Sequence, residues 1–142
     1  FKGALGLFKP NEEKILSEQQ KNKLSIKCAS VDQNITELSG GNQQKVIISK
    51  WMVCNPEVVI FDEPTRGIDV GAKSEIYRIM RELSMEGKAI LMVSSELPEI
   101  ISVCDRVVVF RGGEISKILD NNENLTEELI MSWALPGEKG AI

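Results

Sequence analysis

The chain has 142 residues, of which 42% are hydrophobic and 27% are charged, and its formal net charge is −4. This length supports one domain with a modest core, and the hydrophobic content is that of an ordinary soluble globular protein, which excludes a disordered chain. No apolar run reaches the ~18 residues that a membrane-spanning helix needs. The acidic balance disfavours nucleic acid as the main partner, because phosphate binding favours a basic surface.

The usage of histidine and cysteine narrows the possible chemistry. The sequence contains no histidine, so the commonest metal ligand and the commonest general base are both excluded. Cys28, Cys54 and Cys104 match no zinc spacing and no disulfide framework, which indicates three plain thiols in a reducing cytosol. The first ten residues, FKGALGLFKP, lack an initiator methionine and resemble no signal peptide. We therefore expect this start to be a boundary inside a longer protein.

The first third of the chain is expected to be helical. Residues 1–36 are polar, with a weakly patterned helical lead-in. A clearer helix is expected over 42–54, where apolar side chains recur at helical intervals and Asn55-Pro56 stops the helix; these side chains are Val46, Ile47, Trp51 and Cys54. We interpret Trp51, Tyr77 and Trp133 as packing residues.

A βαβ unit is expected over 58–93. The run at 58–61 predicts a strand that is buried on both faces, as in a parallel sheet. An amphipathic helix follows, with Gly87 as its stop, and 89–93 forms a second buried strand. Because the connection is a crossover, the two strands should be parallel. The apolar stripe of the helix is Ile76, Ile79 or Met80, and Leu83.

The last third is expected to hold a hairpin and a terminal helix. Residues 106–110 and 114–119 flank Gly112-Gly113, which is typical of a hairpin. A helix is expected over 124–134, with Asn124 as its cap. The fold class is therefore α/β.

The segment Leu38–Lys45, with the sequence LSGGNQQK, places a hydroxyl and two glycines at the start of a helix. Free backbone N–H groups at a helix N-terminus suit an anion such as a phosphate. The plain alternative is a capped helix that follows a flexible turn.

The segment 58–64, VVIFDEP, places two carboxylates at the C-terminal end of a strand, where open α/β sheets bind ligands. Asp62 could hold Mg²⁺ through its hydration shell, and Glu63 could orient or deprotonate an attacking water. The alternative is a solvated strand end.

Taken together, LSGGNQQK at 38–45 and DEPTRGIDVGAK at 62–73 resemble the ATP-binding cassette (ABC) family over about residues 38–119. The resemblance implies that Ser39, Gly40, Gly41, Asn42 and Gln43 are a nucleotide-binding signature. It also implies that 58–64 is the Walker B strand with Glu63 as its catalytic carboxylate, and that Asp69 lies in a D-loop. DEPTRGIDVGAK and the later SSELPEI are similar to the second cassette of bacterial importers for ribose- or galactose-type sugars.

The family's phosphate-binding loop, G-x-x-x-x-G-K-[ST], is absent. The nearest candidate, 67–74, follows the Asp-Glu strand and has Ala72 where the second glycine belongs, so a Cβ would crowd the phosphates. We expect Lys73 to lie exposed in the first turn of a helix. The true loop is expected N-terminal to residue 1.

The family usually carries a switch histidine after the next strand, and here Ser95 takes that position. Serine can form hydrogen bonds but does not exchange a proton near neutral pH, so the contact to the γ-phosphate is weakened. The plain interpretation of Ser95 is a cap for a helix at 96–103.

The resemblance implies a partial P-loop NTPase core at 55–142 with a mostly parallel sheet, preceded by part of a helical subdomain at 1–54. The complete protein would be an ATP hydrolase of a sugar importer that uses ATP and Mg²⁺, whereas this chain alone would be inactive. Its partners would be a second cassette, transmembrane permease subunits and, indirectly, a substrate-binding protein, at the cytoplasmic face of the inner membrane.

Three interpretations remain open. The first is the transport ATPase, in which this part mainly completes the active site of the other cassette. The second is a regulatory cassette half that binds nucleotide without turnover. The third is a cassette protein of ribosomes or DNA repair, which a basic linker or a long coiled coil would favour.

Overall fold

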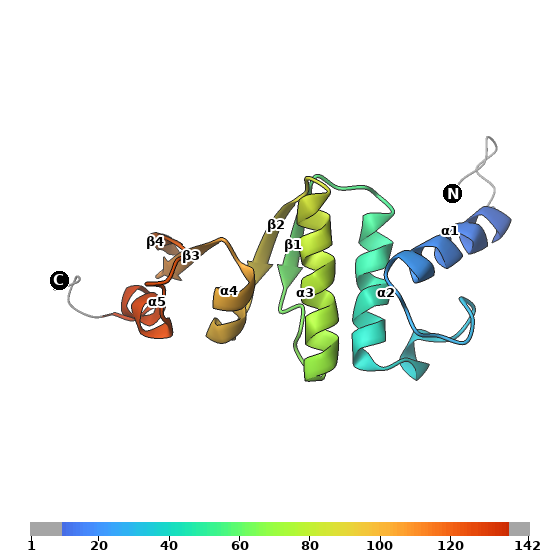
Figure 1. The fold of residues 1–142 in the computed structure, drawn as a ribbon, viewed down its shortest axis with the longest axis horizontal. Helices are drawn as coiled ribbons and strands as arrows, with labels where there is room; N and C mark the ends of the chain where they lie inside the picture. The colour runs from blue at the N-terminus through green and yellow to red at the C-terminus, as the bar shows by residue number, and fades with distance from the viewer. Residues whose placement is uncertain (1–9, 137–142) are drawn as a thin grey trace. The chain divides into compact units, whose positions relative to one another are not determined.

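A computed structural model describes residues 10–136, which divide into two compact units: unit 1 up to residue 91 and unit 2 from residue 92. Their border falls inside one strand, and each unit is described here by itself (Figure 1). None of the helices within the described residues is long and apolar enough to cross a membrane. A domain border after residue 54 stays a prediction.

Unit 1 begins with three helical elements. Helix α1 (Pro10–Lys23) is followed by a loop, a short 3₁₀ helix η1 (Ile35–Glu37) and helix α2 (Gly40–Met52). Acidic residues lie in the first turn of α1 and lysines in its last turn, which suits the helix dipole. Helix α1 packs on α2, and the leucine that follows α1, Leu24, is buried.

The predicted βαβ unit is present. Strand β1 (Val58–Asp62), helix α3 (Val70–Met85) and strand β2 (Ala89–Val93) follow in order, and β1 and β2 form one two-stranded sheet. The amide of Ala89 donates to the carbonyl of Glu57, so both strands start at the same edge and run parallel. Gly87, with φ of +89°, follows the end of α3 as predicted.

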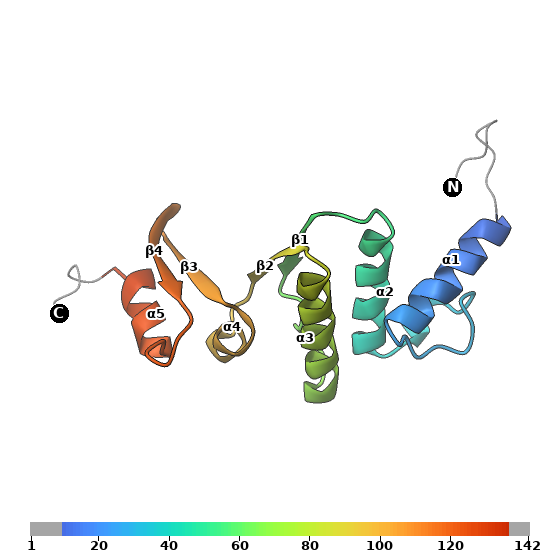
Figure 2. The ribbon, with the colours of Figure 1, turned by 45° about the horizontal axis from the view of Figure 1, so that its top comes forward.

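Helix α3 lies beside α2 and against the sheet, which Figures 1 and 2 show from two directions. The predicted apolar stripe of α3 is confirmed, and all of its members are buried: Ile76, Ile79, Met80 and Leu83.

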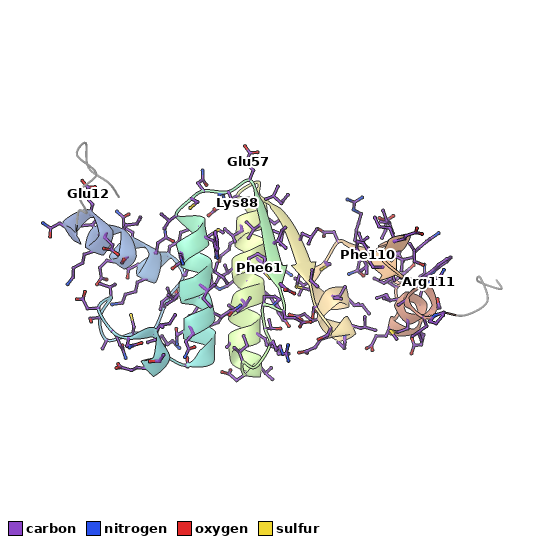
Figure 3. The ribbon with its side chains drawn as sticks, turned by 180° about the vertical axis from the view of Figure 1, so that it is seen from behind. Glu12, Glu57, Phe61, Lys88, Phe110 and Arg111 are labelled. Atoms are coloured by element: carbon purple, nitrogen blue, oxygen red, sulfur yellow. The ribbon has the colours of Figure 1, made fainter. Side chains whose placement is uncertain are left out.

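The prediction that β1 is buried on both faces is wrong, and so is the prediction that β2 is a buried strand. In β1, Val59 and Phe61 are buried, whereas Val58 and Ile60 are 60% and 67% exposed. The side chains of β2 are half-buried or exposed. The reason is the period of two along a strand: α3 packs on one face of the sheet, so alternate side chains face away from it. Figure 3, seen from behind, shows β1 in front of α3, with Phe61 near one end and Glu57 beyond the other.

The predicted apolar stripe of α2 is also wrong. Ile47 and Trp51 are 46% and 62% exposed, so Trp51 is not a packing residue in the described part of the chain, and Cys54 lies exposed beyond the helix. The buried face lies on nearly the opposite side of the helix and contains two polar side chains; its members are Gly41, Lys45, Ile48, Ser49 and Met52. Hydrophobicity alone therefore selected the wrong face of this helix.

Unit 2 contains helix α4 (Leu97–Val103), strands β3 (Arg106–Arg111) and β4 (Glu114–Asp120), and helix α5 (Glu127–Ala134). The predicted hairpin is confirmed, because β3 and β4 are antiparallel around two glycines that both have positive φ, Gly112 and Gly113. A bulge lies between Val109 and Phe110; Figure 3 labels Phe110 and Arg111 beside it. The core consists of Val107, Val109, Leu125 and Ile130, with half-buried Trp133 packed against it.

Two predicted helix caps in unit 2 are wrong. Helix α5 is capped by Thr126, whose side chain accepts from the amide of Leu129, and not by Asn124. Helix α4 begins after Glu96, which makes no side-chain cap. The hydroxyl of Ser94, and not that of Ser95, accepts from the Glu96 amide. Thr126 caps α5 because its hydroxyl lies within reach of a backbone amide in the first turn of that helix, whereas α4 has no side-chain cap.

Candidate nucleotide-binding site

The N-terminus of α2 carries the predicted signature segment. The Gln43 amide donates to the Ser39 carbonyl at 2.9 Å, so the amides of residues 40–42 precede the intrahelical ladder. Ser39 is the N-cap residue by its backbone, yet its side chain makes no cap hydrogen bond. These amides, the exposed Ser39 hydroxyl and the positive end of the helix dipole form a geometry suited to an anion.

Side-chain hydrogen bonds hold this segment in place. The amide group of Asn42 donates to the Ser39 hydroxyl at 2.8 Å and accepts from the backbone N–H of Lys27 at 2.8 Å. The Gln43 side chain donates to the Leu38 carbonyl at 2.8 Å. Asn42 therefore connects Ser39 to the loop after α1, which limits the motion of the Ser39 hydroxyl.

The two signature glycines pack against the segment 67–72. A Cβ on Gly41 would lie 2.5 Å from the Cβ of Ala72, and a Cβ on Gly40 would lie 3.3 Å from a methyl of Ile68. Glycine is thus required at position 41 for the close approach of α2 and α3, in addition to any role of its amide. The structure brings residues 39–43 and the predicted D-loop together in one unit.

Asp69, the predicted D-loop residue, caps α3. Its carboxylate accepts from the amide of Ala72 at 2.9 Å, and α3 begins at the next residue, Val70. The segment 67–74 is therefore a capped helix start, in which the amides of Ala72 and Lys73 are already bound to Asp69. Lys73 lies in the first turn of α3, as predicted, but it is half-buried, so the expectation that it is exposed is wrong.

Asp62 and Glu63 lie at the carboxyl end of β1. Asp62 is exposed and ends the strand, and Glu63 is half-buried with φ of +47°, in the left-handed region that favours glycine. A glutamate held in this conformation costs about 1 kcal/mol, and strained backbone of this kind clusters at functional sites. The two residues that follow, Pro64 and Thr65, are buried and fix the turn.

The donor set at this strand end fits Mg²⁺ when the ion keeps its waters. Magnesium is bound by one or two carboxylates together with waters and substrate phosphates, and the exposed Asp62 carboxylate with its neighbour Glu63 provides that chemistry. Within residues 10–136, no cluster of three or more His, Cys, Asp or Glu side chains could form a metal cage. Such a cage is not needed for a hydrated ion on a phosphate ligand.

Ser95, at the predicted switch position, is exposed and lies between β2 and α4. Its neighbour Ser94 makes the local hydrogen bonds, donating to the buried Glu99 carboxylate and accepting from the Glu96 amide. Ser95 therefore does not shape the start of α4.

Lys45, the last residue of LSGGNQQK, is a structural feature of the site, and no role was predicted for it from the sequence. It is 2% exposed, and its ammonium group donates to the Ser25 carbonyl at 2.7 Å and to the Glu75 carboxylate at 2.8 Å. The spacing contained the signal: Lys45 precedes Ile48, Ser49 and Met52 by three, four and seven residues, which puts it on the buried face.

Comparison with known proteins gives consistent matches. The family model described as ABC transporter matches residues 6–66. A D-allose import ATP-binding protein of Escherichia coli is 64% identical over 138 residues, which is 97% of this chain and 27% of that protein. A ribose import ATP-binding protein of Rhizobium meliloti is 52% identical over 131 residues, which is 92% of this chain and 25% of that protein. The chain therefore spans about a quarter of the length of these curated relatives.

Solved structures agree with the fold. A nucleotide-free ATP-binding cassette from an ABC transporter superposes with a TM-score of 0.75 at 23% identity, over 87% of this chain and 48% of that one. A dimeric cassette of a bacterial ABC transporter superposes with a TM-score of 0.69 at 20% identity, over 82% of this chain and 50% of that one. The fold is thus that of part of an ATP-binding cassette.

Proposed function

We propose that this chain is a member of the ABC transporter family and part of the ATP-binding subunit of a monosaccharide import system. The complete protein would couple the binding and hydrolysis of ATP to sugar uptake. The observation that carries this proposal is the 64% identity over 138 residues to a D-allose import ATP-binding protein. The relative that imports ribose supports the same substrate class, a monosaccharide.

Within this system, residues 39–43 would bind the phosphates of an ATP that is held mainly by a second cassette. The free amides at the start of α2 and the exposed Ser39 hydroxyl support this role, because both can donate to a γ-phosphate. Asp69 would lie at the same interface, since its segment packs on Gly40 and Gly41. In this import system the partners of the chain are a second cassette and the permease subunits, at the cytoplasmic face of the membrane. A substrate-binding protein would act on the permease.

Asp62 and Glu63 would serve a second ATP site, together with a phosphate-binding loop that the chain does not contain. Asp62 would hold Mg²⁺ through water, and when bound the ion would neutralise the phosphate charge. Glu63 would orient the attacking water and accept its proton, and the left-handed backbone at Glu63 supports a functional constraint there. Ser95 cannot exchange a proton near neutral pH, so this site would turn over slowly.

The consequence is an asymmetric pair of sites, in which this chain mainly completes the active site of the other cassette. The alternative is a regulatory half without turnover; it is favoured by the serine at position 95. Closure of two cassettes around ATP would supply binding energy only in the ATP state, which is how hydrolysis could drive the permease.

The test is transport by the complete protein with its permease and binding protein in proteoliposomes. We expect ATP-dependent uptake of labelled D-allose or ribose, with sugar-stimulated ATP hydrolysis. Hydrolysis that no monosaccharide stimulates, with no uptake of either sugar, would contradict the proposal. A disaccharide serves as the control substrate, because the proposal limits uptake to monosaccharides.

A further inference from the structure

Lys45 is an unusual residue to find inside a small protein unit. Its side chain is 2% exposed, although α2 also has a solvent-exposed face on which a lysine would stay hydrated. Burial of an ammonium group is costly unless it is paired and hydrogen-bonded. Here both conditions are met within unit 1, since the ammonium group bonds to one carbonyl and one carboxylate.

The two partners of Lys45 come from different elements. Ser25 belongs to the turn after α1, and its φ of +51° is uncommon for a serine. Glu75 belongs to α3, and the hydrogen bond from Lys45 holds the pKa of Glu75 below its ordinary value. The Lys45 side chain therefore joins α2 to the end of α1 and to α3 at the same time.

The same three elements hold the signature segment. The loop that contains Ser25 also provides the Lys27 amide, which donates to the Asn42 side chain at 2.8 Å. The helix that contains Glu75 also contains Ala72, against which Gly41 packs. Lys45 lies one helical turn after Gly41, so it fixes α2 just behind the free amides.

We infer that Lys45 is a positioning residue for the signature segment. It keeps residues 39–43 and the Asp69 segment in one fixed arrangement, so that both reach a bound nucleotide together. This inference rests on the proposed function, in which residues 39–43 contact ATP in the closed state. Lys45 does not touch the nucleotide itself, because its ammonium group is enclosed between Ser25 and Glu75.

The test measures kcat and KM for ATP in the complete protein with its permease. We expect Lys45→Met to lower kcat about tenfold or more, because a displacement of about 1 Å can cost up to about a hundredfold in rate. KM for ATP should change less than about threefold, because the proposed function has the ATP held mainly by the second cassette. Lys45→Arg should recover most of kcat, since arginine can donate to both partners.

Three further variants separate the possible outcomes. Lys50→Met removes an exposed lysine from the same helix and should leave kcat unchanged. Glu75→Gln keeps an acceptor oxygen and removes only the charge, so it should lower kcat in the same direction as Lys45→Met. It provides the test if Lys45→Met folds poorly. Ser39→Arg tests the signature role itself.

If Lys45→Met and Glu75→Gln hydrolyse ATP like the wild type while Ser39→Arg is inactive, the inference on Lys45 is wrong and the proposed function stands. The inference is also wrong if turnover in Lys45→Met falls only in proportion to the amount of folded protein and Lys45→Arg does not restore it. If Ser39→Arg retains full turnover, the proposed signature role fails first.

Discussion

Gly41 and Ala72 pack so closely that a methyl group on Gly41 would lie 2.5 Å from the Ala72 Cβ. This contact joins the first turn of α2, which contains the predicted signature, to the first turn of α3, which Asp69 of the predicted D-loop caps. A glycine that sequence analysis selects for its free amide is thus also required by packing between two helices. The two requirements can be separated by mutation.

Gly41→Ala should destabilise the protein by about 1–3 kcal/mol, because the added methyl overpacks a helix contact that has backbone nearby. The neighbouring change Gly40→Ala should cost less, since its Cβ would meet a methyl of Ile68 at 3.3 Å, which a small side-chain shift relieves. Thermal unfolding of the complete protein measures both. The double variant Gly41→Ala/Ala72→Gly should regain part of the loss; no recovery would contradict the packing explanation.

The segment 67–74 should not bind phosphate. The amide of Ala72 is already bonded to the Asp69 carboxylate, and that negative charge lies where a phosphate would have to lie. Calorimetry on this chain alone should detect no micromolar binding of ATP, and Lys73→Ala should give the same result. Micromolar binding that disappears in Lys73→Ala would show that the segment is a phosphate loop after all.

The ion pair between Lys45 and Glu75 should make stability fall in acid. The pKa of Glu75 is lowered from 4.5 in the folded chain, first by the hydrogen bond from Lys45. The pair therefore contributes fully above pH 4.5, and its contribution is lost as the pH falls through the lowered folded value. The difference in melting temperature between wild type and Glu75→Gln should shrink from pH 7 to pH 3. A difference that stays constant over this range would contradict the assignment.

The cysteines should differ in reactivity. Burial raises the pKa of Cys104 above 9.0, and the nearby Asp105 and Glu99 add to this effect, whereas Cys54 is exposed. Because the thiolate is the reactive form, Cys104 should be alkylated by iodoacetamide several-fold more slowly than Cys54 at pH 7.5. Mass spectrometry of the two peptides measures the rates. Equal rates would contradict the burial of Cys104.

Most of the fold follows from local patterns in the sequence. The stripe of α3, the stop at Gly87 and the glycine pair of the hairpin each depend on residues close in the chain, and the structure confirms all three. The exposed face of β1 could not be predicted, because a run of four apolar residues is the same whether one or both faces are covered.

The candidate site was predictable as a set of segments but not as a network. The position of residues 39–43 at the start of a helix followed from the sequence. The contact of Gly41 with Ala72 and the burial of Lys45 depend on residues 20 or more positions apart, where the sequence carries no local signal. A lysine is usually counted as a solvent-facing residue, which is why the buried face of α2 was assigned wrongly.

The central claim is that this chain mainly completes an ATP site formed with another cassette. The most direct test compares ATP turnover of the complete protein with its permease in Ser39→Arg and in Glu63→Gln. We predict that Ser39→Arg abolishes hydrolysis, because a bulky cation replaces the hydroxyl at the start of α2, whereas Glu63→Gln retains most of it. Equal damage from Glu63→Gln would show that this chain hosts its own hydrolysis without a histidine, and the asymmetric account would be wrong.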